Sequence, residues 1–222
     1  MKALILAAGR GERMKPLTDT TPKPLLLVNG KPLIVYTIES LVAAGITDLV
    51  INLAYLGAQI ENTLGNGSRF NANITYSREG QNALETAGGI IHALPLLGNA
   101  PFLAINADIA CDFPLSRLTD KKIDLAHLVL IKNPKHHPGG DFGLENNTIK
   151  TQATEKFTFS GIGIYSPELF ANTPPGKSKL APLLRYAAQK NQVSGEIHCG
   201  FWMDIGTPER LTDLEKYYNQ LT

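Results

Sequence analysis

Apolar residues occur along the chain in short uncharged runs that alternate with stretches of helical spacing. The first run, Lys2–Ala7, has no charge after its first residue, which is typical of a buried parallel strand. A helix is expected from about Pro32 to Ala44, because apolar residues recur there at helical spacing and Gly45 follows as a stop. The same reasoning predicts strands at 48–53, 73–77, 101–108 and 124–131, and helices at 55–64, up to about 97, at 180–189 and from 207 onward.

This β-α-β-α-β rhythm predicts an open, mixed but mostly parallel sheet with helices on both faces, a Rossmann-like α/β architecture. Three short segments, 141–144, 148–150 and 157–165, are rich in strand formers. They predict a small antiparallel cover over the edge of that sheet. Because no repeat, linker or low-complexity segment interrupts the 222 residues, we expect a single domain, 1–222.

Composition excludes several classes of protein. Hydrophobic content of 43% and charged content of 18% are typical of a globular domain, and the net charge is only +1. No global field therefore attracts nucleic acid or a membrane surface, and any site for an anion must be local. Cys111 and Cys199 lack the spacing of a zinc motif, and no apolar run reaches membrane length. We expect a cytoplasmic protein with no obligate protein partner.

The candidate chemistry begins where the first strand ends, at 8–11 (Ala-Gly-Arg-Gly). Glycines let a ligand approach backbone N–H groups closely, and Arg13, Lys15 and Lys23 follow. A glycine turn ringed by cations at the carboxyl end of a strand predicts a cradle for a polyphosphate. A dinucleotide fingerprint is disfavoured, because Met14 stands where its third glycine should be and Pro16 interrupts the helix. A turn that only packs a helix on the sheet remains the bland alternative.

The run 6–18, Leu-Ala-Ala-Gly-x-Gly-x-Arg-Met-x-Pro-Leu-Thr, is followed by Pro-Lys-Pro at 22–24. Together they resemble the signature of the sugar-1-phosphate nucleotidyltransferases. Trp-x-Asp-x-Gly-Thr-Pro at 202–208 is similar to a further motif of that family, and Asp108, after an apolar strand, matches its metal position. Taken alone, Asp108 would more often be a helix cap or turn former.

The resemblance implies a nucleotidyltransferase fold whose antiparallel part covers the sugar pocket. It implies one Mg²⁺ held by Asp108 and Asp204, with Arg13 on the β- and γ-phosphates and Lys23 on the α-phosphate. The segment 84–89, Leu-Glu-Thr-Ala-Gly-Gly, is similar to the family's base-reading loop, although Glu85 stands where many members have glycine. The other nucleotide-binding residues expected are Ala8, Gly9, Arg10, Gly11, Glu12, Glu79, Leu84, Thr86 and Asn106.

The substrates implied are UTP and a sugar 1-phosphate. Gly143, Glu155, Ser160 and Gly161 are expected to contact the sugar, and N-acetyl-α-muramate 1-phosphate in peptidoglycan recycling is the favoured acceptor. Glucose 1-phosphate or mannose 1-phosphate is the alternative within the family. A catalytically silent nucleotide-sugar-binding regulator is the alternative from another class. Such a protein should have lost one of the four charged residues assigned to catalysis, Arg13, Lys23, Asp108 and Asp204, and none is lost.

Two adjacent histidines, His136 and His137, raise the question of a second metal site. They lie in a segment dense in turn residues, 133–143, and no third ligand stands near them in the sequence. Neighbouring side chains in an extended loop also point in different directions. We therefore predict that both histidines belong to a solvated loop.

Overall fold

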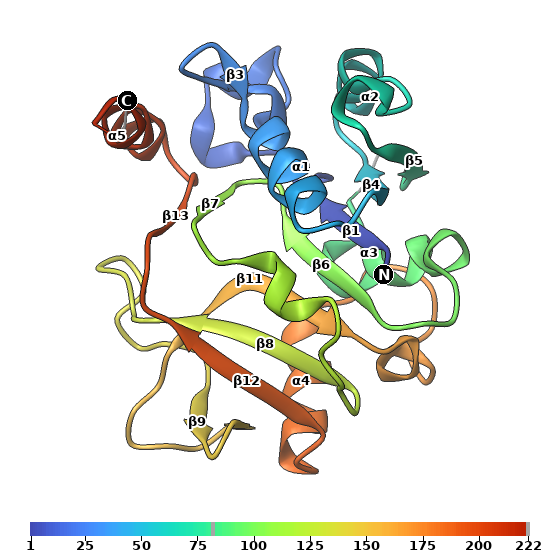
Figure 1. Cartoon of the computed structure of the whole chain (residues 1–222), viewed down its shortest axis with the longest axis vertical. Helices are drawn as coiled ribbons and strands as arrows, with labels where there is room; N and C mark the ends of the chain where they lie inside the picture. Colours follow the sequence, from blue (N-terminus) through green and yellow to red (C-terminus); the bar gives the residue numbers. More distant parts are fainter. Residues whose placement is uncertain (81–82, 221–222) are drawn as a thin grey trace.

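The computed structural model describes residues 1–80 and 83–220, and its centre is a nine-stranded sheet (Figure 1). Most neighbouring strands of the first two-thirds of the chain run parallel, and β11 runs antiparallel to both of its neighbours. The fold-class prediction is confirmed. In order across the sheet the strands are β5 (Asn73–Arg78), β4 (Asp48–Leu53), β1 (Ala3–Leu6), β6 (Phe102–Asn106), β11 (Thr158–Tyr165), β8 (Ala126–Ile131), β12 (Val193–His198), β10 (Thr148–Lys150) and β9 (Gly143–Glu145).

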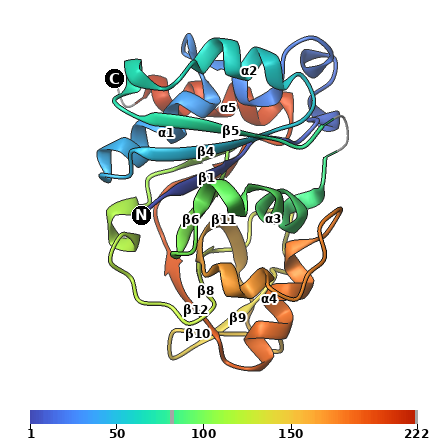
Figure 2. The same cartoon turned by 90° about the vertical axis from the view of Figure 1, so that its right-hand side faces the viewer.

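Helices cover both faces of the sheet (Figure 2). Buried residues of α1 (Leu33–Ala43) and α2 (Gly57–Leu64) form one core cluster with the sheet, and those of α3 (Glu85–Leu97) and α4 (Leu180–Gln189) form another. Side chains of the last helix, α5 (Pro208–Asn219), belong to a third cluster. Two small sheets pair β2 (Leu27–Val28) with β3 (Lys31–Pro32) and β7 (Ile109–Cys111) with β13 (Trp202–Asp204). Short 3₁₀ helices occupy Glu12–Met14, Leu17–Asp19, Lys23–Leu25, Ser68–Phe70, Leu115–Leu118 and Pro167–Phe170.

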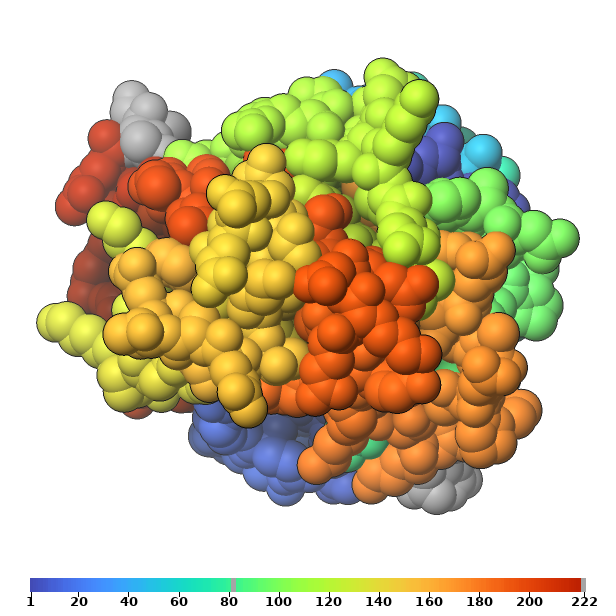
Figure 3. Space-filling model, turned by 90° about the horizontal axis from the view of Figure 1, so that it is seen from below, coloured from blue at the N-terminus to red at the C-terminus, as the bar shows by residue number. Residues whose placement is uncertain are grey.

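The antiparallel part of the fold differs from the expectation in two places. The 157–165 segment was expected to cover the sheet's edge, but β11 lies inside the main sheet between β6 and β8. The sequence did not predict β12, which pairs parallel with β8 and whose polar residues Ser194 and Glu196 contact His127 of that strand. The β9–β10 hairpin does lie at the edge, and in Figure 3 its segment (yellow) abuts that of β12 (orange-red).

The order of strands creates a crevice. From β1 the chain passes through α1 to β4 on one side, and α3 later carries it to β6 on the other side. Ligands of open α/β sheets bind at such a switch point, outside the carboxyl ends of the strands. The glycine turn after β1 and Asp108 after β6 therefore face the same crevice.

Gly88, in the first turns of α3, supports this crevice by close packing. The amides of Ala87 and Gly88 donate to the Ser178 carbonyl oxygen at 3.0 and 3.1 Å, so the loop before α4 lies directly on α3. A Cβ on Gly88 would overlap the carbonyl oxygen of Gly176. This backbone contact requires glycine at position 88, although alanine would otherwise make the helix more stable.

We expect Gly88→Ala to destabilise the protein by about 1–3 kcal/mol, the usual cost of overpacking, although Gly→Ala inside a helix normally stabilises by about 1 kcal/mol. Urea unfolding of the variant measures the difference. An unchanged or higher free energy of unfolding would show that the 176–178 loop moves away at little cost.

Candidate active site

A cavity of about 460 Å³ opens at the carboxyl ends of β1 and β6. It brings together the glycine turn, the candidate phosphate-binding cations and the start of α3. Residues expected from the sequence that line it are Ala8, Gly9, Gly11, Glu12, Arg13, Lys23, Glu79, Thr86, Asn106 and Asp108. Residues that line it and that the sequence did not predict include Asn52, Glu85, Lys177 and Gly206.

Gly11 gives the phosphate cradle its shape. It has a φ of 68°, in the left-handed region that favours glycine, and a Cβ there would lie 3.0 Å from Thr18 Cγ2. Its carbonyl oxygen accepts from Thr18 Oγ1 and from the Met14 amide, both at 2.8 Å. Gly9 has open space around its missing side chain. The loop is thus folded on itself with bare backbone toward the cavity.

The charges of the cradle are divided between internal pairs and an open cation. Glu12 pairs with Arg10 at 2.7 Å and with Lys15 at 2.9 Å, and the Lys15 hydrogen bond lowers the pKa of the Glu12 carboxyl. Arg10 also stacks over the Tyr55 ring and does not line the cavity. Within residues 1–80 and 83–220, Arg13 makes no ion pair. Its guanidinium is therefore available to an anion.

Lys23 and Asp108 form an ion pair across the crevice. The Lys23 side chain is 11% exposed and that of Asp108 is 33% exposed, so each charge is partly removed from water. A partly buried ammonium needs a partner, and a carboxylate in the same place needs a cation. The pair places a cation and a carboxylate side by side at the point where β6 ends.

Strand pairing brings the second predicted metal ligand, Asp204, next to the Asp108 segment, although Asp204 itself does not line the cavity. Asp204 lies opposite Ile109 in the β7–β13 pair, and the Ile205 amide donates to the Asp108 carbonyl oxygen at 2.8 Å. The partly exposed Asp204 carboxylate forms an ion pair with Arg210, and a carboxylate in such a place needs a cation. Asp108 and Asp204 thus lie on adjacent backbone segments, and their carboxylate oxygens are ligands that Mg²⁺ prefers.

Asn52 links the start of α3, which the sequence predicted to contact the base, to the glycine turn after β1. It is buried in β4, accepts from the Ala7 amide at 2.7 Å and donates to Glu79 at 2.6 Å. Glu79 in turn accepts from the Leu84 amide at 2.9 Å, at the start of α3. Leu84 itself does not line the cavity. A polar residue inside the apolar run of β4 was the signal for Asn52.

The four candidate sugar residues lie in two places. Gly161 has a left-handed φ of 82°, and a Cβ there would lie 2.6 Å from Asn106 Nδ2, while Ser160 O accepts from Trp202 Nε1 at 2.9 Å. These residues adjoin the main cavity. Glu155 lines a separate open hollow of about 620 Å³, and Gly143 packs against Ala153 nearby. Gln81 and Asn82, which precede the predicted base-reading segment 84–89, lie outside the described residues.

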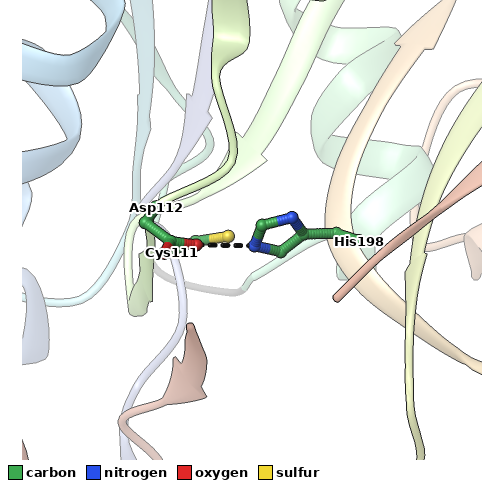
Figure 4. A group of neighbouring side chains, drawn as sticks. All are labelled: Cys111, Asp112 and His198. Atoms are coloured by element: carbon green, nitrogen blue, oxygen red, sulfur yellow. Dashed lines mark hydrogen bonds and ion pairs between the residues drawn. The ribbon is translucent and has the colours of Figure 1, made fainter. Parts of the chain in front are cut away.

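Cys111, Asp112 and His198 face one another at the ends of β7 and β12 (Figure 4). His198 Nε2 lies 2.7 Å from Asp112 Oδ1, and Gly200 leaves room for that contact because a Cβ would crowd both side chains. Burial raises the pKa of the Cys111 thiol to about 11, which favours the protonated thiol over a metal-binding thiolate. We therefore assign the cluster to a structural contact between the two strands.

The family model described as nucleotidyl transferase matches residues 2–220. The chain belongs to the nucleotidyltransferase family. This result confirms the resemblance on which the sequence analysis relied. No helix among the described residues of this nucleotidyltransferase has the length and apolarity needed to cross a membrane.

Relatives of this nucleotidyltransferase carry related names. It is 50% identical to the N-acetylmuramate alpha-1-phosphate uridylyltransferase of Neisseria meningitidis serogroup B, over 97% of each chain. It is 32% identical to the enzyme of that name from Caulobacter vibrioides, covering 93% of this chain and 92% of the relative. It is 31% identical to a mannose-1-phosphate guanyltransferase of Hypocrea jecorina, covering 94% of this chain and 62% of the relative.

Solved structures show the same fold. A UDP-glucose pyrophosphorylase complexed with UDP-glucose superposes with a TM-score of 0.79 at 24% identity, covering 100% of this chain and 99% of that one. HddC from Yersinia pseudotuberculosis complexed with GMP-PN gives a TM-score of 0.80 at 20% identity, with 98% and 99% covered. The architecture is therefore shared well beyond recognisable sequence similarity.

Gly206 offers a test of this geometry. A Cβ there would lie 3.1 Å from Arg13 Nη2, 3.0 Å from Arg210 Nη2 and 3.2 Å from Asp204 Oδ2. We expect Gly206→Ala to lower kcat/KM by about tenfold or more, because displacing groups that hold substrate weakens positioning. Thermal unfolding should stay near that of the parent protein, since the crowded atoms are side-chain ends. If the loss of kcat/KM is instead accompanied by a clear drop in the thermal unfolding temperature, Gly206 would be assigned to folding alone.

Proposed function

We propose that this nucleotidyltransferase transfers a uridylyl group from UTP to N-acetyl-α-muramate 1-phosphate, with residues 1–222 forming one catalytic domain. The products would be UDP-N-acetylmuramate and pyrophosphate, in cytoplasmic recycling of peptidoglycan. The observation that carries the reaction class is the unpaired Arg13 beside the Lys23–Asp108 pair in one cavity. The choice of UTP and of the muramate follows the relative at 50% identity.

The nucleotide would lie along the cavity from the glycine turn to the start of α3. Backbone N–H groups around Gly9 and Gly11 would hold the triphosphate. Arg13 would bind the β- and γ-phosphates, because a planar guanidinium donates to two phosphate oxygens at once. Lys23 would contact the α-phosphate, and Thr86 with the Glu79-supported loop would contact the base.

The attacking group needs little chemical activation. A sugar 1-phosphate is largely a dianion near neutral pH, because its second pKa is about 6. The obstacle is to bring two anions together in line, so positioning and electrostatic stabilisation should carry most of the rate. This explains why the cavity is rich in cations and carboxylates rather than in groups that take up a proton.

Asp108 and Asp204 would hold one Mg²⁺, and their neighbouring strands and hard oxygen donors fit such an ion. When bound, that ion supplies charge neutralisation at the reacting phosphates. Lys23 pairs with Asp108 and Arg210 pairs with Asp204, so both carboxylates would be oriented before substrate binds.

The acceptor sugar would lie beside Ser160 and Gly161, next to Asn106 and Trp202. Glu155 and Gly143 are proposed to form the outer part of this pocket. Because a Cβ on Gly143 would overlap Ala153, a larger residue there would report on packing rather than on the sugar.

Asp108→Asn and Asp204→Asn test the metal assignment while keeping the side-chain shape. Each should lower turnover in Mg²⁺ by more than about 100-fold, as loss of preorganised charge in an active site typically does. Circular dichroism should report an unchanged fold. Near-parental turnover in either variant would remove that aspartate from the proposed metal site.

The substrate assignment is tested by pyrophosphate release from UTP over a panel of sugar 1-phosphates. N-acetyl-α-muramate 1-phosphate should exceed N-acetylglucosamine 1-phosphate by at least about tenfold in kcat/KM, or about 1.4 kcal/mol of discrimination. GTP with mannose 1-phosphate is the control suggested by the 31% identical relative. If glucose or mannose 1-phosphate reacts best, the muramate assignment falls and the family assignment stands.

A further inference from the structure

The carboxylate of Asp204 faces a side chain that the proposed reaction does not use. His136 Nε2 lies 3.1 Å from Asp204 Oδ1 and 3.2 Å from Arg210 Nη1. Arg210 belongs to α5, whereas His136 lies in the loop that joins β8 to β9. Two distant parts of the chain therefore meet at one oxygen of this carboxylate. The expectation that both histidines of this loop are merely solvated is wrong for His136.

The loop that carries His136 is held in place by its own hydrogen bonds. Asn133 Nδ2 donates to the carbonyl oxygens of Pro138 and Lys156 at 3.0 and 2.9 Å, and Asn133 Oδ1 accepts from Thr158 Oγ1 at 2.9 Å. At the other end, Asp141 Oδ2 accepts from the Phe159 amide at 2.8 Å. The loop is thus fixed to the beginning of β11 at both ends. Its geometry presents His136 to Asp204 although the imidazole is partly exposed.

The two oxygens of Asp204 have different surroundings. Oδ1 is next to His136 and Arg210, whereas Oδ2 lies near Gly206, which lines the cavity. A carboxylate whose one oxygen is held by neighbours has fewer orientations, and the other oxygen stays directed toward the site. Partners of this kind, which hold a ligand without touching the metal, typically change metal affinity by about 10–100-fold.

We propose that His136 is a positioning residue that, together with Arg210, orients Asp204 for a divalent cation. This inference rests on the proposed function only in assigning Asp204 to the metal. The role of His136 is independent of which sugar is the acceptor. The same loop also lines the separate hollow that contains Glu155.

The chain supplies a matched control in the neighbouring histidine. His137 Nε2 lies 3.2 Å from Asp141 Oδ1 and contacts its own loop instead of Asp204. Its side chain is 44% exposed, against 43% for His136. Loss of either imidazole should therefore disturb the loop to a similar degree, and only loss of His136 should reach the carboxylate.

The test measures Mn²⁺ binding by electron paramagnetic resonance on the full chain with UTP and without a sugar phosphate. His136→Ala should weaken Mn²⁺ binding by about tenfold, while His136→Gln, whose amide can donate or accept in place of Nε2, should recover most of the affinity. His137→Ala should bind as the parent protein does. Turnover of His136→Ala should rise toward the parental kcat as Mg²⁺ is increased, which a purely structural defect would not do.

Parental or tighter Mn²⁺ binding by His136→Ala would overturn the proposal, and so would an equal loss in His137→Ala. Failure of His136→Gln to exceed His136→Ala would also overturn it. The variant Asp204→Asn distinguishes a failure of the metal assignment from a failure of the proposed role of His136. If that variant keeps parental Mn²⁺ affinity, the metal assignment in the proposed function is wrong. If it loses affinity while His136→Ala does not, only the role of His136 is wrong.

Discussion

The pairing of β13 with β7 is the contact on which the reaction centre depends. It places Asp204 beside β7, the strand that follows Asp108. The Ile205 amide also donates to the Asp108 carbonyl oxygen at 2.8 Å, which holds the two segments together. Three residue pairs are too few to hold β13 against β7 in water, so side-chain packing must supply the remaining stability. The ring of Tyr217 in α5 stacks on that of Phe201 with centroids 3.7 Å apart, and Ile205 is fully buried. Helix α5 therefore acts through its apolar face, which keeps the proposed metal ligand Asp204 in place.

Electrostatics imposes the next constraint. With a net charge of +1, the molecule as a whole does not attract a triphosphate, so the attraction must come from a few cations at short range. Partly buried cations and carboxylates are costly unless each has a partner, and the site meets this cost by pairing. Lys23 pairs with Asp108 and Arg210 pairs with Asp204, whereas Arg10, Lys15 and Glu12, which pair with one another, are exposed. Among the described residues this leaves Arg13 without an ion pair, and in the proposed reaction an incoming phosphate would complete the set of pairs.

The sequence predicted the half of the fold in which local pattern and long-range packing agree. Strands β1, β4 and β6 are apolar runs because strands of a parallel sheet are buried on both faces, and the glycine turn marks where β1 ends. The position of β11 inside the main sheet could not be inferred, because strand propensity carries no information about sheet order. The same limit applied to β12, whose Ser194 and Glu196 alternate with apolar residues and contact His127 of the neighbouring strand.

In the candidate site, too, local sequence indicated some residues, whereas only the tertiary fold brings the others together. Gly11, Arg13 and Lys23 are close in sequence, so their spacing alone indicated a phosphate cradle. The local sequence did not distinguish His136 from His137, although Asp141, the partner of His137, lies only four residues further along the chain. Only the tertiary fold separates them, since the fixed β8–β9 loop directs one imidazole to Asp204 and the other to Asp141. The candidate site is thus assembled partly from segments whose local sequence does not indicate their role. For the two histidines, only the contacts with Asp204 and Asp141 in the folded chain reveal the difference.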